Sequence, residues 1–182
     1  VCSLSGGILT GVGTLALGGA STWASGTMSG TGRTVIAPGA ALALSGAGSK
    51  TLDGRILENT GTVTWTGGNL YGINGATIIL RTGALFDDQN PASHSLMSAY
   101  TGNKPRFTVE TGATLRKSGA GDAYLYDVIF DNAGTVEVDQ GTLALSSIYG
   151  GGSGSHSGIF DIHGGAVLDC GAFTQTLTAG AR

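Results

Sequence analysis

The chain has 182 residues, of which 34 are glycine and only 12% are charged, and its formal net charge at pH 7 is −3. The glycine content would suit disorder or collagen, but 41% of the residues are hydrophobic and the glycines do not recur at every third position, which excludes both. The nine Lys and Arg residues are scattered and no apolar run approaches the about 18 residues of a membrane span, so we predict no nucleic-acid partner and no membrane span.

Residues 1–33 are the least regular part of the chain, although 13–17 and 21–25 still have the composition of β-strands. The rest of the chain is more regular, because residues 36–70 align without a gap on residues 109–143, 73 positions later. A repeat of this kind usually determines the whole architecture. We therefore interpret residues 1–33 as degenerate N-terminal coils of the same structure and not as a separate domain.

A shorter repeat lies inside the long one: a glycine, one or two small residues and an aliphatic residue. Its glycines follow one another at intervals of 22, 22, 29, 22 and 31 residues and are Gly39, Gly61, Gly83, Gly112, Gly134 and Gly165. The two long intervals contain polar segments that we interpret as insertions, near residues 87–103 and 148–158. The unit is therefore about 22 residues long, and roughly seven units fill the chain.

A unit of this length is too short for a helix pair or a propeller blade, but it suits one coil of three short strands and three turns. Segments 62–66, 135–139 and 160–163 alternate apolar and polar residues, as half-buried strands do, and no segment has a helical period. The sequence therefore predicts an all-β fold with almost no helix, a single right-handed parallel β-helix (β-solenoid) over residues 1–182. The alternative is an antiparallel β-sandwich, whose strands have no reason to recur at a fixed interval.

Two asparagines, Asn59 and Asn132, stand two positions before a glycine in equivalent units. We expect their side chains to hydrogen-bond to the backbone of a turn and to form part of an asparagine ladder. The position after each key glycine is Ala or Thr, a mixture that favours an internal ladder of small residues over an ice-binding face of threonines.

Three phrases carry a resemblance to known proteins: GTVTWTGGNLYG (61–72), DNAGTVEVDQGTLALS (131–146) and SGIFDIHGGAVLDCGAFTQTLTAG (157–180). They resemble the repeats of large bacterial secreted and cell-surface proteins: adhesins, autotransporter passengers and filamentous-haemagglutinin-like proteins. The resemblance implies a parallel β-helix stalk, an extracellular or cell-surface location, and a role in adhesion, matrix or filament formation. It implies no catalytic residue.

The spacing of the carboxylates offers no paired catalytic site. Asp87 and Asp169 each stand four residues after a key glycine, three coils apart. Glu58 and Asp131 are likewise equivalent and three coils apart. Three coils span roughly 14 Å, beyond the roughly 5–9.5 Å that separates the carboxyl groups of glycosidases. In the coil after Asp87 the matching residue is Arg116, which predicts a surface ion pair.

The three histidines lack the spacing of a metal site, and we predict no catalytic, metal-binding or cofactor-binding residue and no cofactor. His94 and His156 each stand in a Ser-His-Ser triplet, one in each insertion, which predicts two solvated polar loops. Residues 150–157 have the composition of a flexible loop.

Among the aromatic residues, Trp23 and Trp65 are predicted to fill the core or its edges. A sugar-binding strip would need a continuous platform of exposed rings. The candidates for it come from different strands and do not make such a platform evident: Tyr71, Tyr124, Tyr126 and Tyr149.

The only two cysteines, Cys2 and Cys170, lie near opposite ends of the chain. In a rod roughly 30 Å long, their Cα atoms cannot approach within the about 7 Å that a disulfide requires, so we favour free thiols. A bond between Cys2 of one molecule and Cys170 of another is the alternative.

A solenoid exposes unpaired backbone and apolar core at both ends unless they are capped, and neither terminus here carries a helix or a charged cap. The predicted partners are therefore further copies stacked end to end or further coils of a longer array, with a surface glycan or host receptor as a second kind. With the resemblance, this predicts a structural and adhesive module outside a bacterial cell or on its surface, a stalk or a filament subunit, and not an enzyme. The alternative is a carbohydrate-binding or polysaccharide-degrading β-helix, like a lyase or a tailspike.

Overall fold

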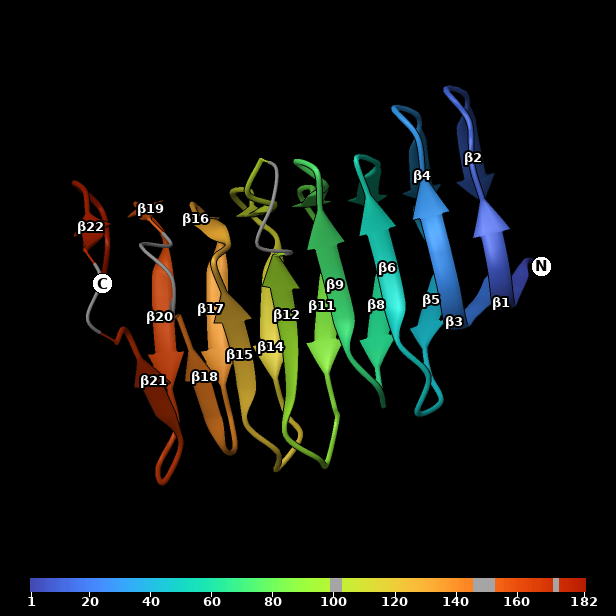
Figure 1. Ribbon diagram of the computed structural model, residues 1–182. Coiled ribbons are helices and arrows are strands. Elements are labelled where there is room, and N and C mark those ends of the chain that lie inside the picture. Colours follow the sequence, from blue (N-terminus) through green and yellow to red (C-terminus); the bar gives the residue numbers. More distant parts are fainter. Residues whose placement is uncertain (99–102, 146–152, 172–173) are drawn as a thin grey trace.

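A computed structural model describes residues 1–98, 103–145, 153–171 and 174–182. The described residues form 22 short β-strands, and they contain no helix that could cross a membrane. The strands stack in parallel, coil upon coil, and the two termini lie at opposite ends of the rod (Figure 1). The predicted all-β fold, a parallel β-solenoid of about seven coils, is confirmed.

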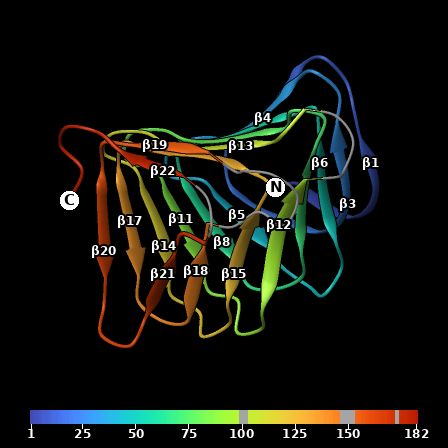
Figure 2. The same ribbon diagram turned by 60° about the vertical axis from the view of Figure 1, so that its left-hand side comes forward.

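Two sheets give each coil three faces. Sheet A has two limbs, which are joined through β1 (Ser3–Leu9) and β3 (Ala20–Ser29), because the two halves of β3 pair with different strands. Sheet B forms the third face, so the outline of a coil is roughly triangular when the view turns toward the rod axis (Figure 2). The first residues of the chain belong to this arrangement, since β1 pairs with β3.

Each face is a column of strands in chain order. Limb 1 continues with β5 (Ala41–Leu44), β8 (Thr62–Trp65), β11 (Leu85–Asp88), β14 (Thr114–Lys117), β17 (Thr135–Val138) and β20 (Ile159–Ile162). Limb 2 continues with β6 (Lys50–Asp53), β9 (Leu70–Ile73), β12 (His94–Ser98), β15 (Ala123–Tyr126), β18 (Thr142–Ala144) and β21 (Val167–Asp169). Sheet B consists of β2 (Thr14–Leu17), β4 (Arg33–Ile36), β7 (Ile56–Asn59), β10 (Thr77–Leu80), β13 (Arg106–Val109), β16 (Ile129–Asn132), β19 (Gly154–His156) and β22 (Gln175–Leu177).

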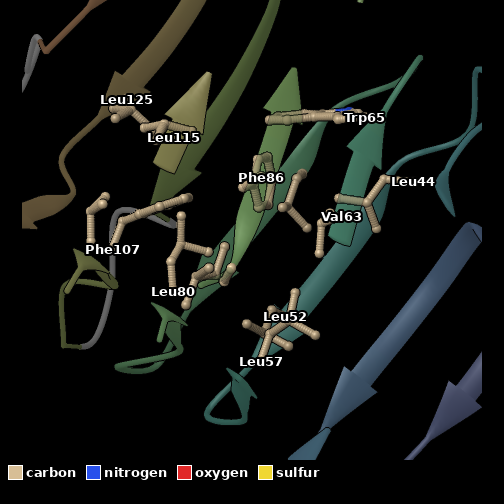
Figure 3. Packing of buried hydrophobic residues seen from close by; sticks show 14 of the residues in the cluster. Leu44, Leu52, Leu57, Val63, Trp65, Leu80, Phe86, Phe107, Leu115 and Leu125 are labelled. Atoms are coloured by element: carbon tan, nitrogen blue, oxygen red, sulfur yellow. The ribbon is translucent and has the colours of Figure 1, made fainter. Parts of the chain in front are cut away.

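The core fills the inside of the coils, because successive side chains of a strand point to opposite faces of its sheet. In β8, Val63 and Trp65 are buried while the threonines beside them remain partly exposed. Large side chains from all three faces meet in this interior (Figure 3). Phe86 lies edge-on to Phe107 with ring centroids 5.5 Å apart. Trp23 is fully buried, so the predicted core positions of both tryptophans are confirmed.

The corner between sheet B and limb 1 has a short form with two residues between the strands, and at two of these short corners an asparagine ends the sheet B strand. Asn59 is fully buried, and its Oδ1 accepts a hydrogen bond from the Gly61 amide at 2.9 Å. Its Nδ2 donates to the carbonyl of Leu85 in the next coil at 2.8 Å. Asn132 makes the equivalent two bonds, from the Gly134 amide and to the Ile159 carbonyl of the next coil, each at 3.0 Å. The predicted turn hydrogen bonds are confirmed.

The long form of this corner has four residues between the strands, and an aliphatic side chain ends the sheet B strand. A backbone bond closes the turn, for example from the Ala84 amide to the Arg81 carbonyl at 2.9 Å, and Gly83 adopts a φ of 83° within it. Leu80 and Val109 end the sheet B strands at long corners and fill the row between the two asparagines. The asparagines are therefore three coils apart, and the predicted asparagine ladder is wrong.

The two forms also place the repeated glycines for different reasons. Gly61 lies in a short corner, where a Cβ would collide with two carbonyl oxygens of the coil below, whereas Gly83 has open space and needs its positive φ. Gly165 belongs to a turn of the second kind at another corner, between β20 and β21. The pairing of β20 with β17 makes Gly158 the equivalent of Gly134. Equal glycine spacing therefore misaligns the last coil.

The two segments predicted as insertions contribute strands. Of residues 87–103, Asp87 and Asp88 end β11, and residues 94–98 form β12, which pairs with β9 and β15. Of residues 148–158, 154–156 form β19, while 148–152 lie outside the described residues. The flexible loop predicted for residues 150–157 therefore has a strand in its described part.

Candidate functional site

The exposed apolar surface lies at the two ends of the rod. Among the described residues, the exposed large hydrophobic side chains come only from the first and last coils: Val1, Ile8, Val12, Ile162, Val167 and Leu177. The strands of these coils pair with another strand on one side only, β1 and β2 at the N-terminal end and β20, β21 and β22 at the C-terminal end, and the Arg182 backbone covers part of the second edge of β20. Each end therefore presents both apolar side chains and open strand edges, the features through which sheets recruit further strands.

The C-terminal end is hollow. The last coil surrounds an open cavity of about 370 Å³, and its walls are mainly aliphatic and aromatic side chains that continue the core: Leu145, Phe160, Leu168 and Leu177. His156, Cys170, Gln175 and Arg182 complete the lining. In every earlier coil the next coil fills this space. The cavity is thus the inside of the solenoid, left open where the described coils end.

His156 is a buried polar side chain of this cavity, and only one of its two ring nitrogens has a hydrogen-bond partner among the described residues. It is 1% exposed and occupies a short corner, at the position that Asn132 has one coil earlier. Its Nε2 lies 2.8 Å from Oε1 of Gln175, and its Nδ1 is buried and without a hydrogen-bond partner among the described residues. The predicted solvated loop at His156 is wrong.

His94 is also buried, at 4% exposure, because it begins strand β12. Its Nε2 lies 2.9 Å from a carboxylate oxygen of Asp88, and its Nδ1 lies 2.9 Å from the Ala92 carbonyl. The ring packs edge-on against Trp65 with centroids 4.3 Å apart. The solvated loop predicted there is wrong too: His94 closes the corner between limb 1 and limb 2 from the inside.

Other long donors serve the same corner, where turning peptides point carbonyl oxygens inward. Lys50 is fully buried, and its ammonium donates to the carbonyls of Gly48 at 3.1 Å and Gly67 at 2.9 Å. Lys117, 1% exposed, donates to the Gly119 carbonyl. Burial lowers the pKa of both lysines. Sequence reasoning missed these cations, since a lysine at a strand end is typical of the surface.

Arg55 donates hydrogen bonds to backbone carbonyl oxygens of the first coils, as Lys50 and Lys117 do further along the rod. It is 2% exposed, and its guanidinium donates to the carbonyls of Gly11 at 3.1 Å and Arg33 at 2.8 Å, while its Nε donates to the Thr34 hydroxyl at 3.0 Å. One side chain thereby ties the irregular first coil to the two coils above it. Residues 1–33 pair with the regular coils through β1, β2 and this contact.

The register confirms that Glu58 and Asp131 occupy one row three coils apart. It also confirms Arg116 as the neighbour of Asp87 in the next coil. The predicted equivalence of Asp87 and Asp169 is wrong, because Asp87 lies on β11 in limb 1 and Asp169 on β21 in limb 2.

In the described residues Asp87 and Arg116 each have other partners in place of the predicted surface ion pair. The Asp87 carboxylate accepts hydrogen bonds from the Ser118 hydroxyl at 2.6 Å and from the Gln89 amide at 2.7 Å. Arg116 instead lies 2.6 Å from Asp139, and that hydrogen bond raises its pKa.

A different pair of carboxylates lies on adjacent coils. Glu137 of β17 and Asp161 of β20 are register partners, so roughly one coil spacing of about 4.8 Å separates their backbones. His163 lies 2.8 Å from Asp139 and 3.6 Å from Asp161, and Arg116 lies 3.8 Å from Glu137. Sequence reasoning missed this cluster because it counted the last coil from the wrong glycine.

This cluster of Arg116, Glu137, Asp139, Asp161 and His163 lies on the outer face of limb 1, and opposite charges pair within it. The cluster does not line the cavity at the C-terminal end. In the described part of the chain, no group of three or more His, Cys, Asp or Glu residues is arranged to hold a metal ion. What the arrangement offers is charge pairing between coils.

Three tyrosines share the outer face of limb 2. Tyr71 and Tyr126 occupy one row, two coils apart, with Met97 between them in the register. Tyr124 stacks on Tyr126 with ring centroids 5.1 Å apart and an angle of 4° between planes. The fourth candidate, Tyr149, lies outside the described residues. The register thus brings residues from separate strands closer to a platform than the sequence indicated.

Both cysteines are free thiols in this structure. Cys2 lies beside limb 1, where its carbonyl accepts the Thr22 amide, and Cys170 follows β21 in limb 2. Burial, followed by the charge of Asp169, raises the pKa of the Cys170 thiol.

Comparisons of the chain with protein-family models, with curated proteins and with solved structures find no match.

Proposed function

We propose that this chain is a structural segment of an elongated β-solenoid outside a bacterial cell, a surface stalk or a filament subunit, whose two ends are stacking surfaces for further coils. The observation that carries the proposal is the position of the exposed large apolar side chains, which in the described residues are confined to the first and last coils. Terminal repeats of a free-standing solenoid present a polar outer face. Both ends here present the core instead.

The sides of the rod support the same role, because their charged groups link coil to coil. On sheet B, Glu58 lies 2.8 Å from Arg33 and 2.9 Å from Arg81, and Arg81 lies 2.5 Å from Glu110. These groups are partly exposed, so each pair is worth only about 0–1 kcal/mol. Their arrangement along the axis resists separation of successive coils. The location outside the cell rests on the resemblance of the repeats to those of secreted and surface proteins.

A tandem fusion of two copies tests whether the ends are stacking surfaces. The Arg182 amide donates to the Gly158 carbonyl and its carbonyl accepts from the Phe160 amide, so Arg182 stands opposite Ile159 in limb 1. The register of β1 with β3 extrapolates Val1 to the same row. In a fusion that omits Arg182 and joins Ala181 of the first copy to Val1 of the second, Val1 takes the place of Arg182. The strands of the second copy then continue the rows of the first in register. We expect one straight rod of double length by electron microscopy and small-angle scattering, and a higher Tm than that of the single chain.

The matched control is the same fusion with Arg182 retained, which shifts the junction by one residue and turns inward side chains outward. We expect it to melt below the in-register fusion. Two separate rods joined by a flexible hinge in both fusions, with the Tm of the single chain, would contradict the proposal.

The tyrosines on limb 2 favour a second candidate function, the binding of a neutral glycan. The described outward positions of limb 2 near Tyr71 and Tyr126 include Thr51 and Asp53 and no Lys or Arg, which disfavours an acidic polysaccharide. A glycan array with the wild type and Tyr126→Ala tests this candidate. A polysaccharide-degrading role would appear as release of reducing sugar that Glu137→Gln abolishes, and that result would overturn the structural proposal.

A further inference from the structure

Two of the tyrosines on the outer face of limb 2 are held in place by the residue two positions before them. Oδ1 of Asn69 accepts the Ser95 amide of the next coil at 3.1 Å, which turns its Nδ2 toward the Tyr71 hydroxyl, 3.4 Å away. Asp122 repeats this arrangement two coils later: one carboxylate oxygen accepts a backbone amide of the following coil at 3.0 Å, and the other accepts the Tyr124 hydroxyl at 3.4 Å. Both phenols are therefore positioned before a ligand arrives, which lowers the entropic cost of binding one.

The third tyrosine of this face is held by stacking. Tyr126 lies parallel to Tyr124, and each ring covers one face of the other, so the pair is a single rigid block. Strands β9, β12 and β15 are neighbours in the sheet (Figure 1), and Tyr126 shares its row with Tyr71. All three rings are partly exposed, and none belongs to the buried core. Tyrosine provides a large amphipathic contact area at little entropic cost, so rigid rings in such a position suit a ligand.

The two anchored hydroxyl groups have opposite hydrogen-bonding character. The Tyr71 oxygen accepts from Asn69, so its own proton is left to donate. The Tyr124 hydroxyl donates to Asp122, so its lone pairs are left to accept. Neither hydroxyl has a second partner among the described residues. A ligand that carries hydroxyl groups, which both donate and accept, can bind the two phenols at once.

The charged groups near the tyrosines are already paired or hydrogen-bonded. Asp53 accepts the Asn74 amide at 2.7 Å, and both carboxylate oxygens of Asp122 accept hydrogen bonds. Lys104, at the corner that leads to sheet B, lies 3.8 Å from Asp127. A charged ligand would have to compete with these contacts, whereas a neutral one leaves them intact. Aromatic rings, hydroxyl groups and paired charges together favour a neutral sugar.

The register sets the length of the sugar chain. Tyr71 and Tyr126 are two coils apart, or about 9.6 Å at a coil spacing of about 4.8 Å. One pyranose unit of an extended glycan is comparable in length with one coil. A glycan that lies along the rod axis therefore places one unit at Tyr71, one opposite β12 and one at Tyr126. Three units are the shortest chain that reaches both tyrosines.

We propose that limb 2 binds a linear neutral glycan along the rod axis, with Tyr71 and the Tyr124–Tyr126 pair as two stacking subsites two coils apart. This rests on the second candidate function, because it gives that site its subsites, its direction and the length of its ligand. Asn69 and Asp122 act as positioning residues for the rings and are not themselves stacking groups.

Calorimetric titration with linear β-1,4-linked oligosaccharides of glucose, mannose and N-acetylglucosamine, from disaccharide to hexasaccharide, tests the subsites. In the series that binds, we expect the trisaccharide to bind roughly threefold to tenfold more tightly than the disaccharide, the worth of one further stacked ring. Tyr71→Thr should remove this step and leave the disaccharide affinity unchanged. Thr51 occupies the same row one coil earlier, so the strand accommodates threonine. Tyr71→Phe keeps the ring and should keep the step.

The matched control is Leu85→Thr on the outer face of limb 1, where Thr62 and Thr114 are its register neighbours. It should bind every oligosaccharide like the wild type. Absence of binding in all three series, a trisaccharide no tighter than the disaccharide, or an unchanged step in Tyr71→Thr would overturn the proposal. An affinity that falls steeply with salt would show that the ligand is recognised by charge and would overturn its neutral class. These variants leave both end coils untouched, so the tandem fusions judge the structural role independently.

Discussion

The buried asparagine of the short corner gives a prediction that isolates two hydrogen bonds. Asn59→Leu removes the acceptor for the Gly61 amide and the donor to the Leu85 carbonyl. Leu80 occupies the same row one coil later, so the row accommodates leucine and the substitution leaves no large cavity. The change in stability therefore reports the unpaired backbone groups.

The expected loss is set by those groups. An unpaired buried amide or carbonyl costs about 1–3 kcal/mol, and burying the leucine side chain returns part of this, so we expect a loss of about 2–4 kcal/mol. For a chain of this size each kcal/mol lowers the Tm by about 2–4 °C, which predicts a fall of roughly 5–15 °C by calorimetry.

The repeat supplies its own control. Asn132→Leu changes the same two bonds, made at 3.0 Å each, and should lower the Tm by a similar amount. Leu80→Asn places an amide at a long corner, where a backbone bond already pairs the turn amide, and should destabilise rather than stabilise. If Asn59→Leu melted at or above the wild-type temperature, the assignment of the short corner to its side-chain bonds would be refuted.

Three further predictions concern the glycines and the buried cations. Gly61→Ala should lower the Tm more than Gly83→Ala, because its Cβ collides with backbone whereas Gly83 has open space and only a strained φ, and melting curves of the pair check this. Burial lowers the pKa of Lys117 below 10.5, so between the lowered pKa and 10.5 the unfolded chain binds more protons than the folded chain. The free energy of unfolding therefore rises as the pH increases through this range. Lys117→Met should flatten the rise, which melting curves at several pH values measure. Arg55→Met should speed amide hydrogen exchange in residues 11–33 and leave the last coils unchanged.

The sequence by itself determined the architecture, because its signals are local. Alternation in segments such as 62–65 shows which side chains face inward, and the recurrence of small residues every 22 or so positions shows where a coil turns. The match of Asp87 with Arg116 comes from counting four residues from Gly83 and from Gly112. These features need only a period of two within a strand and a glycine that recurs at the corners of the coils.

Only the tertiary structure decided which positions meet across coils, because the same kind of glycine turn occurs at two different corners of the coil, as at Gly83 and Gly165. Counting from glycine to glycine therefore set Asp169 opposite Asp87 and hid the adjacency of Glu137 and Asp161. The environment of a polar side chain inside the coil is equally non-local: His156 is 1% exposed because it lies beside Asn132, 24 residues earlier in the row, and Gln175, 19 residues later. Burial and pairing between coils depend on register, and corners of two and of four residues both contain a glycine, so the sequence alone does not tell them apart.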